Sequence, residues 1–287
     1  MALVGLATCR ELPVDSNDNE LLTTALAARG IDTAEPIWND DKVDWSRFDL
    51  VVIRTTWDYT HYLADFLAWV HSLTSVANPA SVVAWNTDKH YLANLAERGV
   101  GVVPTTFVNS LAEFEVPEAE RFVVKPTVGA GSMGAERFES TQITEAKRHA
   151  ESLFSQGRDV MIQPYLERVD SVGETGIIVL DGVISHAIEK GPMLSVSELD
   201  RTGLFRQESI QPRAASQLEC DVALAALRAA CEITGLSEPL LYARVDLLPS
   251  EEGPVVIELE LTEPSLFLSF SPQSADLFAE AIARRVE

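Results

Sequence analysis

The sequence predicts a mixed protein in which a parallel α/β unit at the N-terminus is followed by two α+β lobes. Short apolar strands alternate with helical segments up to about residue 88, which is typical of a parallel sheet. A strand at 121–126 then runs into a glycine-rich loop, and beyond residue 171 hairpin patterns replace the alternation. We therefore expect three parts, at residues 1–88, 89–170 and 171–287.

The composition excludes several classes of partner. With 22 basic and 44 acidic residues the net charge is −22, which disfavours nucleic acid and anionic lipid. No apolar run approaches the ~20 residues of a membrane span, and the N-terminus lacks the basic segment of a signal peptide. We expect a cytoplasmic protein with no membrane or nucleic-acid partner. The oligomeric state stays open, and a homodimer is compatible with the sequence.

In the first part, two strands are predicted to end at a common edge. Ala2–Ala7 and Asp49–Arg54 are apolar, and helical patterns follow at Glu20–Arg29 and Tyr62–Leu73. Ligands of parallel sheets bind at the carboxyl ends of the strands. The residues predicted there as contacts of a second substrate are Cys9, Arg54, Trp57, Asp58 and Tyr59.

The second part contains the glycine-rich loop. Arg121–Pro126 is a predicted strand that carries Lys125 near its end, and the loop Gly129–Gly134 follows. Glycine lets backbone N–H groups approach phosphates closely, and a lysine adds a point charge. The loop matches neither a Walker A motif nor a dinucleotide fingerprint, so an ordinary flexible turn is the alternative. The other elements predicted here are Lys89–Gly99 (helix), Val102–Val108 (strand), Thr144–Gln156 (helix) and Asp159–Pro164 (strand).

The third part is predicted to be mainly antiparallel. Glu174–Leu180 and Val183–Glu189 flank the turn Asp181-Gly182 and form a hairpin. Leu194–Arg213 shows no clear period and is predicted to be a loop, with Arg206 as a candidate contact of a substrate carboxylate. The remaining elements are the helix Ala214–Thr234, the strands Leu241–Leu248 and Pro254–Leu261, and the helix Ser274–Val286.

A metal site is predicted on the last two strands. Residues i and i+2 of a strand face the same side, so Glu258 and Glu260 project together. Two carboxylates on an otherwise apolar strand require a cation or basic groups nearby. With Asp246 on the neighbouring strand they form a set of oxygen ligands suited to Mg²⁺. The alternative is a solvated acidic edge strand.

Cationic residues accompany these carboxylates. Arg244 lies two residues before Asp246 and therefore on the same strand face, where it suits the charge of a transferring phosphoryl group. A simple salt bridge with Asp246 is the competing interpretation. Lys89 and Lys190 complete the cationic set. Glu174 opens the hairpin, and His186 lies across its turn, either as a substrate contact or as a structural histidine.

The order of these motifs resembles the ATP-grasp superfamily over roughly residues 86–270. The series is NTDK, FVVKP with its glycine-rich loop, IQPYLE, GET, DGVISHAIEK, ARVD and IELELTEP. The segments RTTWDY (54–59), NTDK and ELELTEPSLFL are similar to the glutathione-synthetase-like branch that includes the O-ureido-serine cyclo-ligase of cycloserine biosynthesis. The resemblance implies an ATP-grasp fold, in which two α+β lobes clasp ATP behind an N-terminal α/β unit, and a role in antibiotic biosynthesis.

Carried over to this sequence, the resemblance implies a set of ATP contacts. Lys89 and Lys125 would contact the phosphates, and Glu167 or Glu174 would reach the ribose. The lid over the phosphates would consist of Gly129, Gly131, Ser132, Met133 and Gly134. The hinge that binds adenine would consist of Gln163, Pro164, Tyr165 and Leu166. Two Mg²⁺ ions would be held by Asp246, Glu258 and Glu260, although many members have asparagine in place of Glu260.

The activity implied is that of a ligase that phosphorylates the carboxylate of a small amino-acid-like substrate, so that a nitrogen can attack the acyl phosphate. Arg244 and Lys190 are the candidate catalytic residues. No side-chain nucleophile is needed, and none is evident in the sequence. Ring closure within one molecule and joining of two molecules both remain open. The rival from another class is an ATP-binding module without catalysis.

Overall fold

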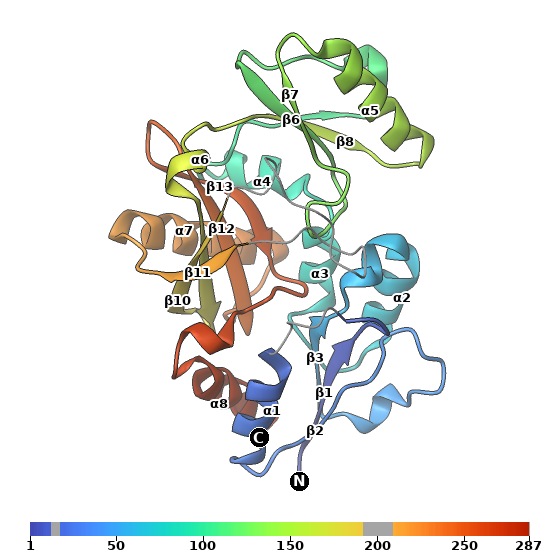
Figure 1. Cartoon of the computed structure of the whole chain (residues 1–287). Coiled ribbons are helices and arrows are strands. Elements are labelled where there is room, and N and C mark those ends of the chain that lie inside the picture. Colours follow the sequence, from blue (N-terminus) through green and yellow to red (C-terminus); the bar gives the residue numbers. More distant parts are fainter. Residues whose placement is uncertain (13–17, 192–208, 287) are drawn as a thin grey trace.

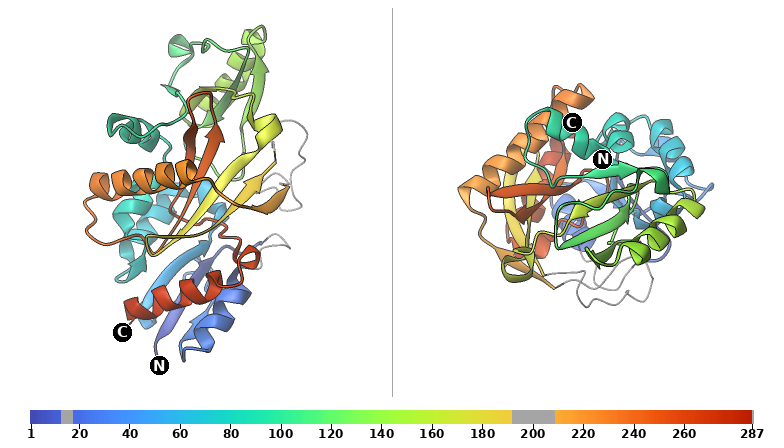
Figure 2. Two further views of the ribbon diagram at one scale, coloured as in Figure 1. Left: turned by 90° about the vertical axis from the view of Figure 1, so that its left-hand side faces the viewer. Right: turned by 90° about the horizontal axis from the view of Figure 1, so that it is seen from above.

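The chain folds around three β-sheets stacked in three tiers, as a computed structural model shows (Figure 1). The model describes residues 1–12, 18–191 and 209–286. The parallel sheet lies near both termini, the five-stranded sheet is in the middle, and a small antiparallel sheet forms the opposite end of the molecule (Figure 2). No helix in these three ranges is long and apolar enough to cross a membrane.

The N-terminal sheet is wholly parallel, with the strand order β2-β1-β3-β4. Its strands are β1 (Leu3–Thr8), β2 (Asp32–Ala34), β3 (Leu50–Thr55) and β4 (Val76–Ala77). The helices of this part are α1 (Asp18–Ala27), α2 (Leu63–Ser72) and α3 (Ala80–Asn86), with 3₁₀ turns η1 (Trp45–Arg47) and η2 (Trp57–His61). The two strands and two helices predicted here are confirmed. β2, β4 and α3 were not predicted, because such short segments show no period.

The sheet at the far end is antiparallel, with the order β5-β8-β6-β7. Its strands are β5 (Thr106–Val108), β6 (Arg121–Pro126), β7 (Glu136–Glu139) and β8 (Val160–Pro164). Helices α4 (Tyr91–Glu97) and α5 (Ile143–Ser155) and the turns η3 (Leu111–Glu113) and α6 (Val169–Val172) belong to the same stretch of chain. Phe122 and Val124 of β6 pack with Ala146 and Ala150 of α5 in a separate small core.

The central sheet has the order β11-β10-β9-β12-β13 and is antiparallel throughout. Its strands are β9 (Glu174–Leu180), β10 (Val183–Lys190), β11 (Ile210–Arg213), β12 (Tyr242–Pro249) and β13 (Pro254–Glu260). Helices α7 (Gln217–Thr234) and α8 (Ser274–Val286) and the turn η4 (Leu268–Phe270) complete the chain. The predicted loop 194–213 is wrong at its end, because 210–213 pair with β10. Residues 194–208 of that loop, Arg206 among them, lie outside the described residues.

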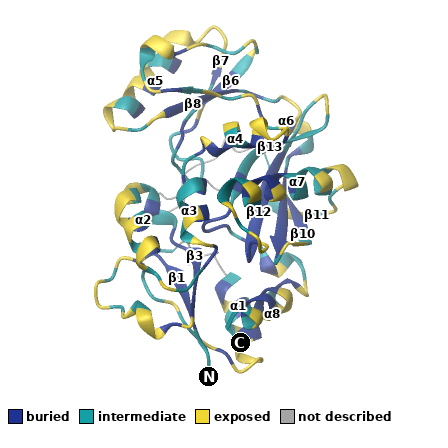
Figure 3. Ribbon diagram, turned by 180° about the vertical axis from the view of Figure 1, so that it is seen from behind, coloured by how far each residue is buried: buried dark blue, intermediate teal, exposed yellow. Residues whose placement is uncertain are grey.

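The two faces of the central sheet bury different cores, as alternation along β9 requires. Ile177 and Val179 belong to the core under α7, and Ile178 and Leu180 belong to the core beside α1 and α8. The strands at the centre of this sheet are accordingly buried on both sides (Figure 3). α8 also packs on α1, so the last helix joins the central sheet to the N-terminal part.

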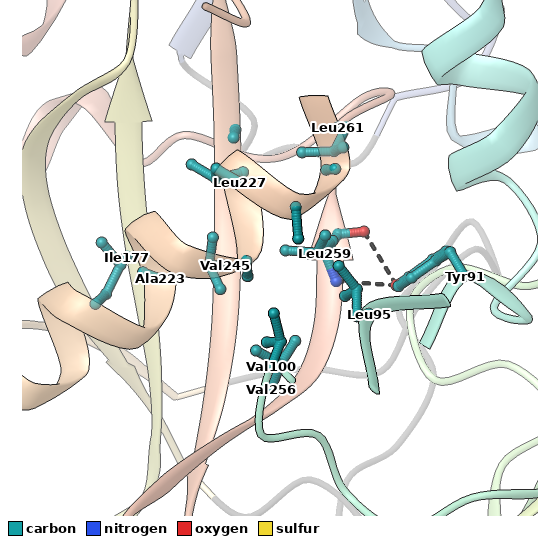
Figure 4. Packing of buried hydrophobic residues seen from close by; sticks show 14 of the residues in the cluster. Tyr91, Leu95, Val100, Ile177, Ala223, Leu227, Val245, Val256, Leu259 and Leu261 are labelled. Atoms are coloured by element: carbon teal, nitrogen blue, oxygen red, sulfur yellow. Dashed lines mark hydrogen bonds between the residues drawn. The ribbon is translucent and has the colours of Figure 1, made fainter. Parts of the chain in front are cut away.

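Strand β13 lies at the edge of the central sheet, and side chains from the preceding helices satisfy its outer backbone groups. Asn86 donates to the carbonyl of Leu259 at 2.8 Å and accepts from the N–H of Leu261 at 2.9 Å. The hydroxyl of Tyr91 accepts from the N–H of Leu259 at 2.9 Å (Figure 4). Asn78 donates to the carbonyl of Leu261 at 2.8 Å. The strand is therefore held on both sides, although only one side is a strand pair.

We expect Asn86→Ala to lower the free energy of unfolding by about 1–3 kcal/mol, because the buried N–H of Leu261 then lacks its partner, whereas the carbonyl of Leu259 keeps the hydroxyl of Tyr91 at 3.1 Å. Urea unfolding followed by circular dichroism measures this change. Asn39→Ala, at an exposed position, is the matched control and should change stability by less than about 0.5 kcal/mol. Equal stability of the two variants would show that the amide does not hold β13.

Candidate functional site

A cleft lies between the small end sheet and the central sheet. Its empty space, with the open mouth included, is about 980 Å³. Most of the predicted ATP contacts line it. These are Lys89, Lys125, Gly129, Gly131, Ser132, Met133, Gln163, Pro164, Tyr165, Leu166 and Glu174. Lys190, predicted as a catalytic residue, and Glu258, predicted as a metal ligand, line it as well.

The glycine-rich loop covers one side of the cleft. Gly131 and Gly134 have positive φ, and a Cβ on Gly134 would lie 3.3 Å from Pro126, so this turn requires glycine there. Lys89 donates from Nζ to the carbonyl of Gly129 at 2.6 Å and pairs with Glu258 at 2.9 Å. One lysine thus joins the loop to the acidic strand across the cleft.

The acidic group forms where β12 and β13 pair. Asp246 lies directly opposite Glu258, and Arg244 lies opposite Glu260. One oxygen from each of the three carboxylates lies within 4.8 Å of the others. Mg²⁺ takes oxygen ligands at about 2.0–2.1 Å, so small side-chain adjustments would bring these oxygens around one ion. The donor set therefore fits a hard divalent cation.

A β-bulge gives this strand pair a feature that simple alternation misses. The register shifts between Asp246 and Leu247, so Val256 pairs with Leu247 while Glu258 pairs with Asp246, and Ile257 is the extra residue. Ile257 and Glu258 consequently both line the cleft, although they are neighbours in sequence. The bulge supplies an apolar wall beside the carboxylate.

Two cations neutralise the carboxylates from within the protein. Lys190 lies 2.6 Å from Asp246 and 2.7 Å from Glu174. Arg244 donates to Asp246 at 2.9 Å and also pairs with Glu260. The predicted salt bridge between Arg244 and Asp246 is therefore present. It does not decide against a role in catalysis, since the same side chain borders the carboxylate group.

Burial and charge together set the pKa values of these groups. Burial opposes ionisation of Asp246, but the charges of Arg244 and Lys190 prevail and lower its pKa to about 2. Burial raises the pKa of Glu260 to about 7; Arg244 opposes this rise, and the charges of Asp246 and Glu258 add to it. Burial also lowers the pKa of Lys125 to about 8, against the attraction of Glu258 and with the repulsion of Lys89. Several ionisable groups are therefore buried close together, where burial and the neighbouring charges both shift their pKa values.

The apolar walls and one glycine were not predicted. Val123, Ala135, Val169 and Leu248 form the apolar end of the cleft together with Tyr165. Gly176 of β9 lies opposite Asp246, where a Cβ would come within 3.0 Å of the carboxylate oxygen Oδ1. The apolar walls could not be predicted, because residues from separate strands leave no local pattern in the sequence. A glycine inside an apolar strand, as at Gly176, does indicate that another group approaches the backbone closely.

Two predicted ATP contacts do not line the cleft. Glu167 forms an ion pair with Arg121 at the surface, so Glu174 is the carboxylate of the predicted pair that lines the cleft. Gly134 lies at the base of the loop, where its carbonyl accepts from His149 at 2.9 Å. Its contribution is to the shape of the turn.

The predicted substrate contacts around β1 and β3 separate into two groups. Cys9 is buried among aromatic side chains, and burial together with the charge of Asp58 raises the pKa of its thiol to about 11. Asp58 accepts from the indole of Trp38 at 2.7 Å. Neither lines the cleft, because both are held by the N-terminal core.

The second group lies against the segment that follows β13. Trp57 donates from Nε1 to the carbonyl of Glu263 at 3.1 Å, and Arg54 donates to the carbonyl of Pro264 at 3.1 Å. Tyr59, although it follows Trp57, packs against Phe66 in the same aromatic core as Cys9 and so belongs with the first group. His186 lies with Nε2 3.1 Å from the carbonyl of Phe267, and burial lowers its pKa. These residues fix the segment behind the carboxylates.

The raised pKa of Glu260 predicts a pH dependence of stability in metal-free protein. Its folded-state pKa of about 7 exceeds the ordinary value of 4.5, so the folded state binds more protons between these pH values. Stability should therefore fall as the pH rises from about 5 to 8, and Glu260→Gln should remove this part of the slope. Urea unfolding in EDTA at several pH values measures it, with exposed Glu251→Gln as control. Equal slopes in wild type and Glu260→Gln would contradict the assignment.

Comparison with known proteins agrees with this geometry. A family model described as the N-terminal domain of the D-cycloserine synthetase DcsG matches residues 4–80. The chain is 41% identical to the cycloserine biosynthesis protein DcsG of Streptomyces lavendulae over 307 aligned residues, which cover 100% of both proteins. The crystal structure of D-cycloserine synthetase DcsG matches with a TM-score of 0.91 and 39% identity, and covers 100% of each chain.

A more distant structure shows the fold alone. The RimK-domain ATP-grasp protein of Sphaerobacter thermophilus matches with a TM-score of 0.67 at 17% identity, covering 98% of this chain and 100% of that one. The resemblance to the ATP-grasp superfamily and its fold is thereby confirmed. With full-length identity of 41% to a curated relative, the chain belongs to the DcsG family and is an enzyme of the ATP-grasp ligase type.

Proposed function

We propose that this enzyme uses Mg-ATP to close the ring of cycloserine within one O-ureido-serine molecule. The observation that carries the proposal is the group of three carboxylates, Asp246, Glu258 and Glu260, beside a cleft. The cleft is lined on its other side by the lysines Lys89 and Lys125 and by the glycine-rich loop. The full-length similarity to a D-cycloserine synthetase supports the choice of product. The same similarity favours ring closure within one molecule over the joining of two molecules.

The cleft offers distinct surroundings for the parts of ATP. Its apolar end, formed by Val123, Tyr165, Leu248 and Ile257, suits the adenine ring. The hinge 163–166 borders this end and presents backbone groups to the ring. Glu174 suits the ribose hydroxyls.

The phosphates would lie at the polar end of the cleft. Lys89 and Lys125 face it from one side, and the loop 129–134 supplies backbone N–H groups above it. With a pKa of about 8, Lys125 is mostly protonated at neutral pH and so adds positive charge there. This arrangement neutralises the polyphosphate without a Walker A motif.

Asp246, Glu258 and Glu260 would hold Mg²⁺, with two ions expected from the family resemblance. When bound, magnesium neutralises the negative charge that builds up as a phosphoryl group transfers. Glu260 takes the place of the asparagine common in the superfamily, and its carboxylate adds a further negative charge toward the cations. Lys190 and Arg244 orient Asp246 and Glu260, and their charges keep Asp246 ionised, whereas Glu260 with a pKa of about 7 is only partly ionised at neutral pH before a cation binds.

The proposed reaction has three steps. The substrate carboxylate first takes the terminal phosphoryl group of ATP and releases ADP. The ureido nitrogen bound to oxygen in the same molecule then attacks the acyl carbon, so that a C–N bond forms, the C–O bond to phosphate breaks and the nitrogen loses its proton. Hydrolysis finally breaks the bond between this nitrogen and its carbamoyl group, which leaves as CO₂ and ammonia and gives cycloserine. Closure of the lobes over the cleft would exclude the water that hydrolyses acyl phosphates. No side-chain nucleophile takes part.

The direct test is incubation of the enzyme with ATP, Mg²⁺ and O-ureido-D-serine. We expect release of ADP and phosphate that depends on this substrate, with a cyclised product detected by mass spectrometry. Tight binding of ATP without substrate-dependent ADP release would point instead to a different substrate. A linear product joining two molecules would contradict ring closure.

Glu258→Gln should lower kcat by at least about 100-fold, because the substitution removes a charged ligand from the group that stabilises the transferring phosphoryl. The variant should unfold at the same temperature as the wild type, since Glu258 lines an open cleft. Glu251→Gln, in the exposed turn between β12 and β13, is the matched control and should retain full activity. Near-normal turnover of Glu258→Gln would refute the metal assignment.

A further inference from the structure

Glu263, three residues beyond Glu260, carries a buried carboxylate that the proposed reaction does not yet use. Its exposed fraction is 8%. Within the described parts of the chain its side chain makes no hydrogen bond and no ion pair, whereas buried polar groups in native proteins almost always have a partner. Burial raises the pKa of this carboxyl well above the ordinary value for glutamate, so its ionised form is unfavourable in the ligand-free protein, and a glutamate at this position requires an explanation.

The backbone around Glu263 is held in place by the N-terminal part. The indole of Trp57 donates to the carbonyl of Glu263, and Arg54 donates to the next carbonyl, that of Pro264. Asp18 at the start of α1 accepts from the N–H groups of Leu266, Phe267 and Leu268 at 2.7–2.8 Å. The backbone that carries the Glu263 side chain is thus fixed where the carboxyl end of β3 meets the segment after β13.

Two further buried groups near this point lack partners. The hydroxyl of Tyr59 has no hydrogen bond to any described residue, and the side chain is 5% exposed. Tyr59 lies two residues after Trp57 in the short helix η2, and the indole of Trp57 holds the backbone of Glu263, so η2 lies against this segment. Burial raises the pKa of Tyr59, and the charge of Glu263 adds to this rise. Thr56 Oγ1 is buried without a partner as well. Tyr59 and Thr56 thus add two polar groups without a described partner to the unpaired carboxyl of Glu263.

The acidic group and its cations do not account for Glu263. The set of carboxylates whose oxygens lie within 4.8 Å of one another contains Asp246, Glu258 and Glu260 but not Glu263. The cations nearby already hold other groups. Lys89 contacts Gly129 and Glu258, Lys190 contacts Glu174 and Asp246, and Arg244 contacts Asp246 and Glu260. None of these three described cations pairs with Glu263, which leaves its carboxyl available to a positively charged group of a ligand.

We propose that Glu263 binds the α-ammonium group of the amino-acid substrate, with the hydroxyl of Tyr59 as a second contact. The inference rests on the proposed function and adds to it the group that positions the substrate. Because the ammonium and carboxylate groups of an α-amino acid share one carbon, an ion pair with Glu263 also restricts where the carboxylate lies. Glu263 is then a binding residue that places the reacting carboxylate near Glu260.

The test is calorimetric binding of O-ureido-D-serine to protein loaded with ADP and Mg²⁺. Glu263→Gln should weaken this binding about 10- to 100-fold, the range for a hydrogen bond to a charged group. Affinity for ADP and Mg²⁺ should stay within about twofold of the wild type, and the ligand-free variant should unfold at the same or a higher temperature, since glutamine replaces an unpaired carboxyl that burial already disfavours in its ionised form. Glu251→Gln is the control, and Glu263→Asp should restore part of the affinity.

A substrate derivative that is acetylated on the α-amino group tests whether Glu263→Gln acts by removing an ion pair or by changing the pocket in general. It should bind weakly and equally to wild type and Glu263→Gln. Unchanged binding of O-ureido-D-serine by Glu263→Gln would overturn the role of Glu263 alone. A lower unfolding temperature with weaker ADP binding would show a structural role instead and would also overturn it. Failure of the wild type to bind O-ureido-D-serine would refute both this inference and the proposed function.

Discussion

The pairing of β12 with β13 is the constraint on which the site depends. It brings Asp246 opposite Glu258 and Arg244 opposite Glu260, so three carboxylates share a small volume. Their repulsion is tolerable because Arg244 and Lys190 pair with them inside the protein. The same proximity that would destabilise the strands alone creates a group of oxygens suited to a divalent cation. The register of one hairpin therefore determines both the electrostatic strain and the chemistry.

The rest of the fold holds this hairpin in position. Side chains of Asn78, Asn86 and Tyr91 complete the hydrogen bonds of the edge strand β13. Arg54 and Trp57 fix the segment that follows it. The N-terminal part thus acts on the site through the backbone of 259–264, although it contributes no lining to the cleft found beside the carboxylates. This explains why a separate α/β unit belongs to the same enzyme.

Several local features conflict with stability but make sense for binding. Glu260 has a raised pKa, Lys125 a lowered one, and Glu263 has no partner in the described chain. Native proteins carry such exceptions mainly at functional sites, where the ligand supplies the missing charge. A cation would relieve the carboxylates, phosphates would relieve the lysine, and a substrate ammonium would relieve Glu263. Each unfavourable group thus corresponds to one part of the proposed complex of the enzyme with Mg-ATP and the amino-acid substrate.

Local patterns in the sequence determined most elements and the chemistry of the carboxylates. Alternation places Glu258 and Glu260 on one face, and the order of motifs indicates the superfamily. The short strands β2, β4 and β11 and the bulge at Ile257 escaped prediction, because a few residues carry no period and a bulge depends on the partner strand. Only the tertiary structure separated Glu174, which lines the cleft, from Glu167, which pairs with Arg121. Likewise only the fold brought Trp57 to the backbone of Glu263, because contacts between residues about 200 positions apart depend on packing and leave no trace in local spacing.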